Sequence, residues 1–194
     1  LPVEMLQALR LIARFPVITA HAFAAKQHYF DRQSLYLHRP QPGLSVAENF
    51  LYSVRHDTQF TREEARLLDL CLVLHMEHGG GNNSAFACRV LSSSGTDIYS
   101  AISAAVGSLK GPKHGGANAR VMKMFDELES SVKDWKDEDE VAAYIAKILK
   151  KEAGDGSGLV YGMGHAIYTL SDPRAVTLKR SARQLAADPG LLDE

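Results

Sequence analysis

The sequence has few cysteines and almost no net charge. Only two of its 194 residues are cysteine, Cys71 and Cys88, and both lie in apolar stretches with helical periodicity. Two isolated cysteines exclude a disulfide-rich secreted scaffold, so we expect two buried free thiols in a reducing compartment. The formal net charge is -1, from 22 basic and 23 acidic residues. The chain as a whole therefore has no attraction for nucleic acid or for an anionic membrane, and any anion site must be local.

Strict alternation and long apolar runs are also missing. No segment keeps the apolar–polar alternation of a half-buried strand, whereas nearly every segment shows the period of a helix. No apolar run approaches the roughly 20 residues that span a bilayer, and no basic and apolar leader opens the chain. We therefore expect an all-α protein with no membrane partner and, by default, a cytoplasmic localisation. The sequence begins at Leu1 without a methionine and ends at Glu194 without a closing signal, which indicates an excerpt of a longer polypeptide.

Proline and capping residues divide the chain into predicted helices. Pro16 is expected to separate an opening pair, over residues 2–14 and 17–30. Two capping boxes, Ser45 with Glu48 and Thr61 with Glu64, are expected to open the next two helices. The second of these two helices is predicted over 61–78, and further helices are predicted over 97–110, 116–130, 137–152 and 173–187.

Two of these helices are unusually apolar. Residues 70–74 carry no charge, and a helix that is apolar on every side is expected to be buried. The helix over 97–110 combines an apolar stripe with Ala, Ser and Gly on its other faces, which fits either a core or a subunit interface. We place a domain junction near His114, which divides a more buried part, 1–114, from a more exposed part, 115–194.

Three of the eight histidines lie beside glycines where helices stop. His78 precedes three glycines, His114 lies in Gly-Pro-Lys-His-Gly-Gly, and His165 lies in Gly-Met-Gly-His. Glycine lets a ligand or a backbone approach closely, and free amides at a helix start bind anions. Imidazole transfers protons near neutral pH. Three such settings in one chain indicate a site for proton transfer and anion binding.

Plainer interpretations exist for each histidine taken singly. His75 and His78 are spaced to bind a metal on one helical face, but no metal site is predicted. The triple glycine lacks the Lys-Ser/Thr ending of a phosphate-binding loop. The other four histidines have no comparable setting and are interpreted as structural or surface residues: His21, His28, His38 and His56.

Together, the segments around these histidines resemble the citrate synthase family. Residues 75–85, HMEHGGGNNSA, resemble the His-x-x-His…Asn-x-Ser signature of that family, and residues 111–118, GPKHGGAN, resemble its most recognisable block. Residues 162–168, GMGHAIY, and the following Asp-Pro-Arg at 172–174 match the next block at the expected distance. The order and spacing of all these segments agree, and the resemblance extends less specifically from about Ser45 to the end.

The resemblance implies a fold, an activity and an assembly. The implied fold is a multi-helical large domain with part of a helical small domain, and the implied assembly is a homodimer. Members of the family condense acetyl-CoA with oxaloacetate to give citrate and CoA, at a cleft between the two domains. Acetyl-CoA is then a co-substrate, and no tightly bound cofactor is implied.

The resemblance also implies roles for individual residues. His114 corresponds to the residue that hydrogen-bonds the thioester oxygen and stabilises the enol of acetyl-CoA, and His165 to the one that polarises the ketone. His78 and Arg174 correspond to residues that bind the oxo acid, and the planar guanidinium of Arg174 suits a carboxylate.

Further positions match parts of the family site that support the histidines or meet CoA. Asn82 and Ser84 match residues that orient the histidines. The strip that meets the adenine of CoA is matched by Gly162, Met163, Gly164 and Ala166. Thr169 stands where a basic residue often contacts a CoA phosphate.

The sequence departs from the family in its last part. The aspartate that acts as the methyl base, and two further arginines that bind the oxo acid, have no counterpart before Glu194; Asp188 and Asp193 lack the family context. We therefore expect little or no condensation activity from this chain alone. Two alternatives stay open: a 2-methylcitrate synthase that uses propionyl-CoA, and a helical ligand-binding module without turnover.

Overall fold

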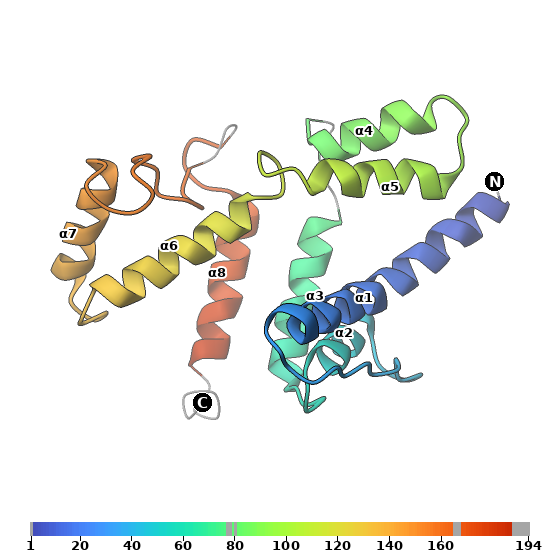
Figure 1. The fold of residues 1–194 in the computed structure, drawn as a ribbon, viewed down its shortest axis with the longest axis horizontal. Coiled ribbons are helices and arrows are strands. Elements are labelled where there is room, and N and C mark those ends of the chain that lie inside the picture. Colours follow the sequence, from blue (N-terminus) through green and yellow to red (C-terminus); the bar gives the residue numbers. More distant parts are fainter. Residues whose placement is uncertain (1, 77–78, 80, 165–167, 188–194) are drawn as a thin grey trace. The chain divides into compact units, whose positions relative to one another are not determined.

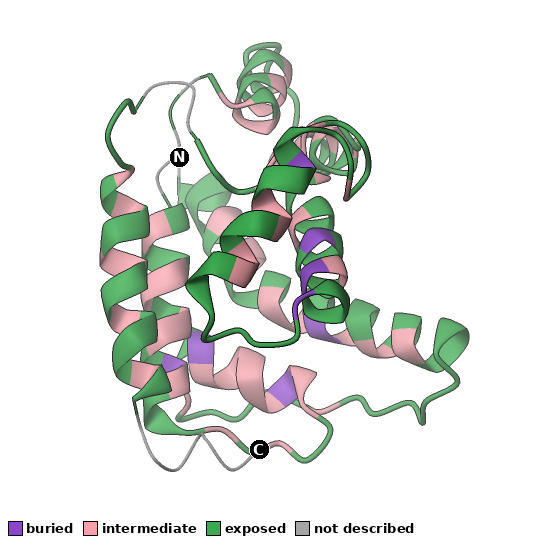
Figure 2. Ribbon diagram, turned by 90° about the vertical axis from the view of Figure 1, so that its left-hand side faces the viewer, coloured by how far each residue is buried: buried purple, intermediate pink, exposed green. Residues whose placement is uncertain are grey.

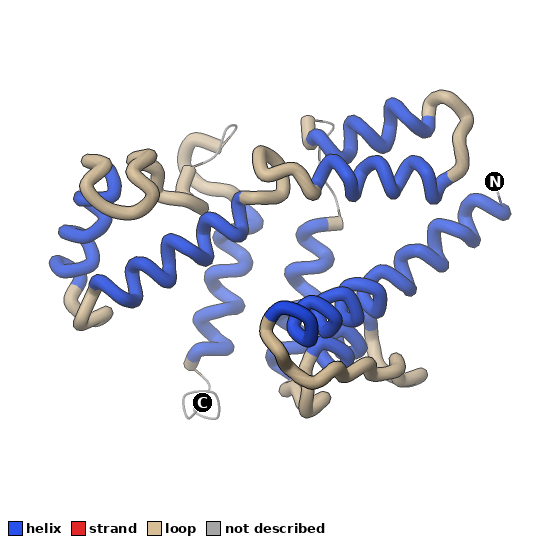
Figure 3. Tube along the Cα trace, in the orientation of Figure 1, coloured by secondary structure: helices blue, strands red, loops and turns tan. Residues whose placement is uncertain are grey.

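The computed structural model describes residues 2–76, 79, 81–164 and 168–187, and every regular element in these residues is an α-helix (Figures 1 and 3). The all-α prediction is therefore confirmed. The helices are α1 (Pro2–Phe30), α2 (Val46–Val54), α3 (Arg62–His75), α4 (Asn83–Ser92), α5 (Ile98–Leu109), α6 (Ala117–Ser131), α7 (Glu138–Leu149) and α8 (Pro173–Ala186).

Local capping starts α2 and α3 where the sequence predicts. At α2 the Ser45 hydroxyl accepts from the Glu48 amide at 3.3 Å, and the Glu48 carboxylate accepts from the Ser45 amide at 2.7 Å. The same reciprocal pair forms between Thr61 and Glu64 at α3. Both predicted capping boxes are confirmed, and each satisfies amides that the first helical turn leaves without partners.

The prediction of two helices before residue 31 is wrong, because α1 is one continuous helix of 29 residues with Pro16 inside it. A proline inside a helix removes one backbone hydrogen bond and costs about 3 kcal/mol. The segment before Pro16 is rich in Leu, Ala and Arg and the segment after it is rich in Ala, and these residues favour the helix strongly enough to carry it through this position.

Helix α1 is long and apolar enough to cross a membrane, by length and composition only. The sequence analysis missed it because Arg10, Arg14 and Pro16 interrupt the apolar run. Only 6% of its most apolar 18-residue window is buried. Core helices of soluble proteins and signal sequences satisfy the same criterion, so it does not assign α1 to a membrane. The absence of a membrane partner stays a prediction.

The chain forms two compact units, which are described separately. Unit 1 comprises residues 1–78 and 172–194, and unit 2 comprises residues 79–171. In unit 1, α2 packs against α1 and α3, and α3 packs against α8. In unit 2, α4 and α5 pack against each other, and α6 and α7 enclose a separate core. The domain junction near His114 stays a prediction about the complete fold.

The core of unit 2 joins α6, α7 and the segment that follows them. The buried side chains are Met124 and Leu128 on α6, Val132 at its end and Ile148 on α7 (Figure 2). Burying each side chain of this size contributes roughly 1.5–3 kcal/mol. Tyr161 packs against this core, which ties the segment before the 162–164 glycines to α6.

The predicted distribution of burial is wrong for this chain. Before His114 the buried apolar residues are all alanines, whereas the larger buried side chains lie after it. The apolar stretch 70–74 in α3 is not buried either, since Val73 is 53% exposed. An apolar composition indicates that a helix needs a partner surface. The helices that pack against α3 and α5 cover only part of the apolar surface of each. Both cysteines are free, as expected, but they are half-buried rather than buried.

Candidate functional site

A tight glycine turn between α5 and α6 holds His114. The amides of His114 and Gly115 both donate to the carbonyl of Gly111, at 3.0 and 2.9 Å. A Cβ atom on Gly115 would lie 2.0 Å from the Leu109 carbonyl oxygen. At Gly116 it would lie 2.3 Å from the Pro112 carbonyl oxygen. The chain turns back on itself so closely that neither position has room for a side chain, and this fixes the backbone on which His114 is carried.

The ring of His114 contacts the start of α4. The Ser84 hydroxyl lies 2.8 Å from Nε2 of His114, and both side chains are half-buried. The side-chain amide of Asn83 donates to the Ser108 hydroxyl at 2.8 Å, which joins the first turn of α4 to the last turn of α5. The packing of α4 on α5 thus brings Ser84 to His114. Among the described residues, Nδ1 of His114 has no hydrogen-bond partner.

Asn82 occupies the N-cap of α4. Its side-chain oxygen accepts from the Ala85 amide at 2.9 Å, so it fixes the position from which the helix starts. Ser84, two residues later, depends on that start for its direction. The contact between Ser84 and His114 is observed. The resemblance implies that Asn82 and Ser84 orient the histidines, and this role stays a prediction.

The predicted CoA strip is an exposed backbone turn in the same unit. Gly162 and Gly164 have φ angles of +82° and +84°, a conformation that side chains with a Cβ rarely adopt. Met163 between them is 76% exposed. A Cβ on Gly162 would lie 3.3 Å from Cγ2 of Val121, so the backbone of the strip rests directly on α6. Gly162 therefore serves both the turn and a close approach to the helix, whereas Gly164 serves the turn alone.

A polar cluster that the sequence analysis does not identify lies just before this strip. The hydroxyl of Tyr161 donates to Asp155 at 2.5 Å, and the guanidinium carbon of Arg120 lies 5.5 Å from the centre of the Tyr161 ring. Hydrogen bonds from Ser157 and then Tyr161 hold the pKa of Asp155 at about 2, so its carboxylate is ionised at neutral pH. The only sequence signal for this cluster is a tyrosine adjacent to Gly162.

Arg174 lies in unit 1, at the first turn of α8. Its guanidinium pairs with Asp172, with Nη2 at 2.7 Å from Oδ2 and Nε at 3.1 Å from Oδ1. Asp172 also accepts from the Arg174 amide, so the N-cap of the helix sets the direction of the arginine. The predicted site residues His78, His165 and Ala166 lie outside the described residues.

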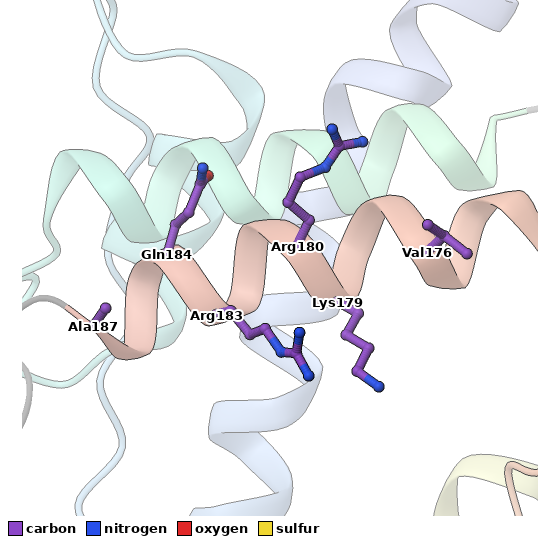
Figure 4. Close-up of a pocket in the computed structure, with 6 residues that line it drawn as sticks. All are labelled: Val176, Lys179, Arg180, Arg183, Gln184 and Ala187. Atoms are coloured by element: carbon purple, nitrogen blue, oxygen red, sulfur yellow. The ribbon is translucent and has the colours of Figure 1, made fainter.

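An open hollow with a volume of about 570 Å³ runs along α8. In Figure 4, Lys179 and Arg183 point to one side of the helix, and Arg180 and Gln184 to the other. Val176 and Ala187 complete the lining. All six residues come from one exposed helix, so the hollow is a basic surface and not an enclosed site.

Metal binding has no support in the described part of the chain, where no three His, Cys, Asp or Glu side chains gather. His75, half of the metal pair considered from the sequence, has its Nδ1 at 2.6 Å from the carbonyl oxygen of Cys71 in its own helix. That contact is ordinary for a histidine in a last helical turn.

Comparison with known proteins places this arrangement in a family. Residues 3–193 match the family model described as "Citrate synthase, C-terminal domain". The chain is 38% identical over 185 residues to a citrate synthase of Acidithiobacillus ferridurans, covering 95% of this chain and 42% of that protein. It is 34% identical over 181 residues to 2-methylcitrate synthase 2 of Corynebacterium glutamicum, covering 91% of this chain and 42% of that protein.

A solved structure agrees with this assignment. The crystal structure of citrate synthase from Thermotoga maritima matches with a TM-score of 0.63 at 34% identity, over 90% of this chain and 42% of that one. The chain thus spans less than half the length of the relatives that it matches. The family model, the relatives and the shared helical fold together show that this chain belongs to the citrate synthase family.

Proposed function

We propose that this chain is part of an acyltransferase that condenses acetyl-CoA with oxaloacetate to give citrate and CoA. The observation that carries the proposal is the contact between Ser84 and His114, which the glycine turn holds in place. Family membership supports the reaction class, and the exposed strip at 162–164 supports CoA binding in the same unit.

The chemical difficulty of this reaction is the weakly acidic methyl group of acetyl-CoA. Its proton leaves only if the negative charge that develops on the thioester oxygen is stabilised. We infer that the Ser84 hydroxyl donates to Nε2 of His114, so that the neutral ring carries its proton on Nδ1. Nδ1 then donates a hydrogen bond to the thioester oxygen of the enol.

The remaining roles follow from the resemblance. His165 polarises the ketone of oxaloacetate and protonates the new alkoxide, and His78 with Arg174 binds its carboxylates. Arg174 suits this role because its planar guanidinium forms two parallel hydrogen bonds to a carboxylate. Its pairing with Asp172 fixes the direction of the guanidinium before a ligand binds. The methyl base is supplied by an aspartate that has no counterpart in residues 1–194.

The experiment that tests the proposal measures CoA thiol release from acetyl-CoA and oxaloacetate. It compares the 194-residue chain with the same chain in its full reading frame. We expect release only from the longer protein, because loss of a general base typically lowers the rate 10²–10⁴-fold. Full turnover by the 194-residue chain would contradict the proposed need for an aspartate outside it. No release by either protein would contradict the citrate assignment.

A second candidate is condensation of propionyl-CoA, as in a 2-methylcitrate synthase. The relative from Corynebacterium glutamicum carries that name and is nearly as similar as the citrate synthases. Competition between the two acyl-CoA substrates distinguishes them through the ratio of their kcat/KM values. The third candidate, a module without turnover, predicts that oxaloacetate binds to the protein in its full reading frame but no product forms.

We also propose a homodimer and a cytoplasmic location. The homodimer is supported by apolar surface on α5, where Val106 is 47% and Leu109 51% exposed. Exposed apolar faces of this kind mark interaction surfaces. Light scattering on the protein in its full reading frame gives a dimer mass if this is correct and a monomer mass if it is not. Cell fractionation tests the location.

A further inference from the structure

A small cavity lies within unit 2 beside the 162–164 strip, with a volume of about 220 Å³. Its floor is apolar and includes Met124, Ile148 and Leu159. Met124 and Ile148 belong to the buried core of the unit, so the floor is a fixed surface. The rim carries charged side chains from α6 and from the loop after α7. This combination suits a ligand with a flat apolar part and a charged group.

Arg120 and Lys123 are the two cations on this rim. Lys123, one turn further along α6, pairs with Glu127 at 3.7 Å. Arg120 forms no ion pair with a described carboxylate, but Asp155 on the same rim lies near enough for the positive charge of Arg120 to help lower its pKa. Asp155 instead accepts hydrogen bonds from Tyr161 and from the Ser157 amide. The guanidinium is therefore held over the Tyr161 ring, with its N–H donors at the edge of the cavity.

Two contacts connect the strip with Arg120 and with its neighbour Val121 on α6. Tyr161, under the guanidinium, immediately precedes Gly162. Val121, the residue after Arg120, is the side chain on which Gly162 rests. The strip thus meets α6 at residues 120–121. In CoA the 3′-phosphate is carried by the ribose that is bonded to adenine. An adenine held at the strip therefore places this phosphate within one sugar ring of residues 120–121.

We propose that Arg120 binds the 3′-phosphate of CoA. The inference rests on the proposed CoA role of the strip and adds the residue that recognises the phosphate. A planar guanidinium forms two parallel hydrogen bonds to a phosphate, which the ammonium group of lysine does not reproduce. Thr169, after the strip, is uncharged where a basic residue often contacts a CoA phosphate. Arg120 on α6 supplies a positive charge near the strip instead.

The test compares two ligands that differ only in this phosphate, CoA and 3′-dephospho-CoA, by calorimetric titration of the 194-residue chain. We expect the chain to bind CoA about ten- to hundredfold more tightly, the usual effect of a hydrogen-bonded ion pair. Arg120→Ala is expected to reduce CoA affinity to that of dephospho-CoA and to leave dephospho-CoA affinity unchanged. Arg120→Lys is expected to give an intermediate ratio. Arg89→Ala, an exposed arginine on α4, is the matched control and keeps the ratio of the unaltered chain.

The ratio of the two affinities separates the possible failures. Equal binding of both ligands by the unaltered chain overturns the inference, whether or not the variants fold. A loss of affinity for both ligands alike in Arg120→Ala also overturns it, because that result shows a structural role. If the unaltered chain binds neither ligand, the CoA strip itself is wrong, and the proposed function loses the same support. If CoA binds preferentially but Arg120→Ala keeps that preference, only the assignment to Arg120 is wrong.

Discussion

The Ser84 hydroxyl lies 2.8 Å from Nε2 of His114, although 30 residues separate them in the sequence. Asn82 caps the helix that carries Ser84, and two glycines fix the turn that carries His114. Each side of this contact is thus set by its own local structure, and the packing of α4 on α5 brings the two together. The contact engages Nε2 of His114 and leaves Nδ1 without a hydrogen-bond partner among the described residues.

Replacing Ser84 with alanine removes the hydrogen bond to Nε2. We expect His114 in the unaltered chain to carry its proton on Nδ1, and the variant to lose this preference. In the full reading frame kcat falls about tenfold, as expected for one lost hydrogen bond. Nitrogen-15 chemical shifts of the ring report the tautomer. Ser94→Ala, in the exposed turn after α4, is the control. Unchanged ring shifts in Ser84→Ala would contradict the assigned direction of the hydrogen bond.

Gly115 and Gly107 provide a matched pair for the glycine turn. An alanine Cβ at position 115 meets the Leu109 carbonyl oxygen at 2.0 Å, whereas at position 107 in α5 it meets nothing within 4 Å. We expect Gly115→Ala to lower the free energy of unfolding by at least about 2 kcal/mol. Gly107→Ala raises it by about 0.5–1 kcal/mol, because alanine favours the helix. Urea denaturation measures both. Equal stability of the two variants would mean that the turn is not as tight as described.

The ion pair between Arg55 and Glu64 predicts a pH dependence of stability. Hydrogen bonding to Arg55 lowers the pKa of Glu64 from 4.5 to about 2. Because this pKa is lower in the folded state, the pair stabilises fully above about pH 4.5, and the stabilisation is lost as pH falls toward 2. We expect about 1 kcal/mol, since Arg55 is partly exposed and solvent screens the pair.

Glu64→Gln tests this dependence, because glutamine keeps the acceptor of the capping box but loses the charge. The variant is expected to be less stable than the unaltered chain near neutral pH and to converge with it toward pH 2. Glu63→Gln, its exposed neighbour in the same turn, is the control. Acid denaturation curves that are the same for the two variants would show that Glu64 has no special role.

Features set by neighbouring residues are predictable from the sequence. The capping boxes at Ser45 and Thr61 and the Asp172 cap of α8 each need only three or four consecutive residues, and all three form. Pro16 shows where such rules fail, because the helix preference of a long segment outweighs one local penalty. The prediction of burial is wrong for a different reason. The apolar stretch 70–74 indicates that the helix needs a partner surface, but not which surface supplies it.

The candidate site also has features that the sequence predicts and features that it does not. The periodicity of helices does not connect Ser84 with any histidine. The family resemblance assigns Ser84 to the support of the site histidines, and only the structure shows that its contact is with His114. The cluster of Arg120, Asp155 and Tyr161 has neither a local pattern nor a family signature. It depends on the loop after α7 folding back onto α6, which only the structure shows.

The proposed role of His114 is to stabilise the enol of acetyl-CoA. The most direct measurement is the initial rate of CoA thiol release from acetyl-CoA and oxaloacetate by the full reading frame carrying His114→Ala. We predict a 10²–10³-fold lower kcat, the usual effect of removing one donor to a developing oxyanion. His28→Ala, with its ring outside the site, should stay within about twofold, as surface substitutions usually do. A His114→Ala variant that keeps the rate of the unaltered protein would contradict the proposed role of His114 in stabilising the enol.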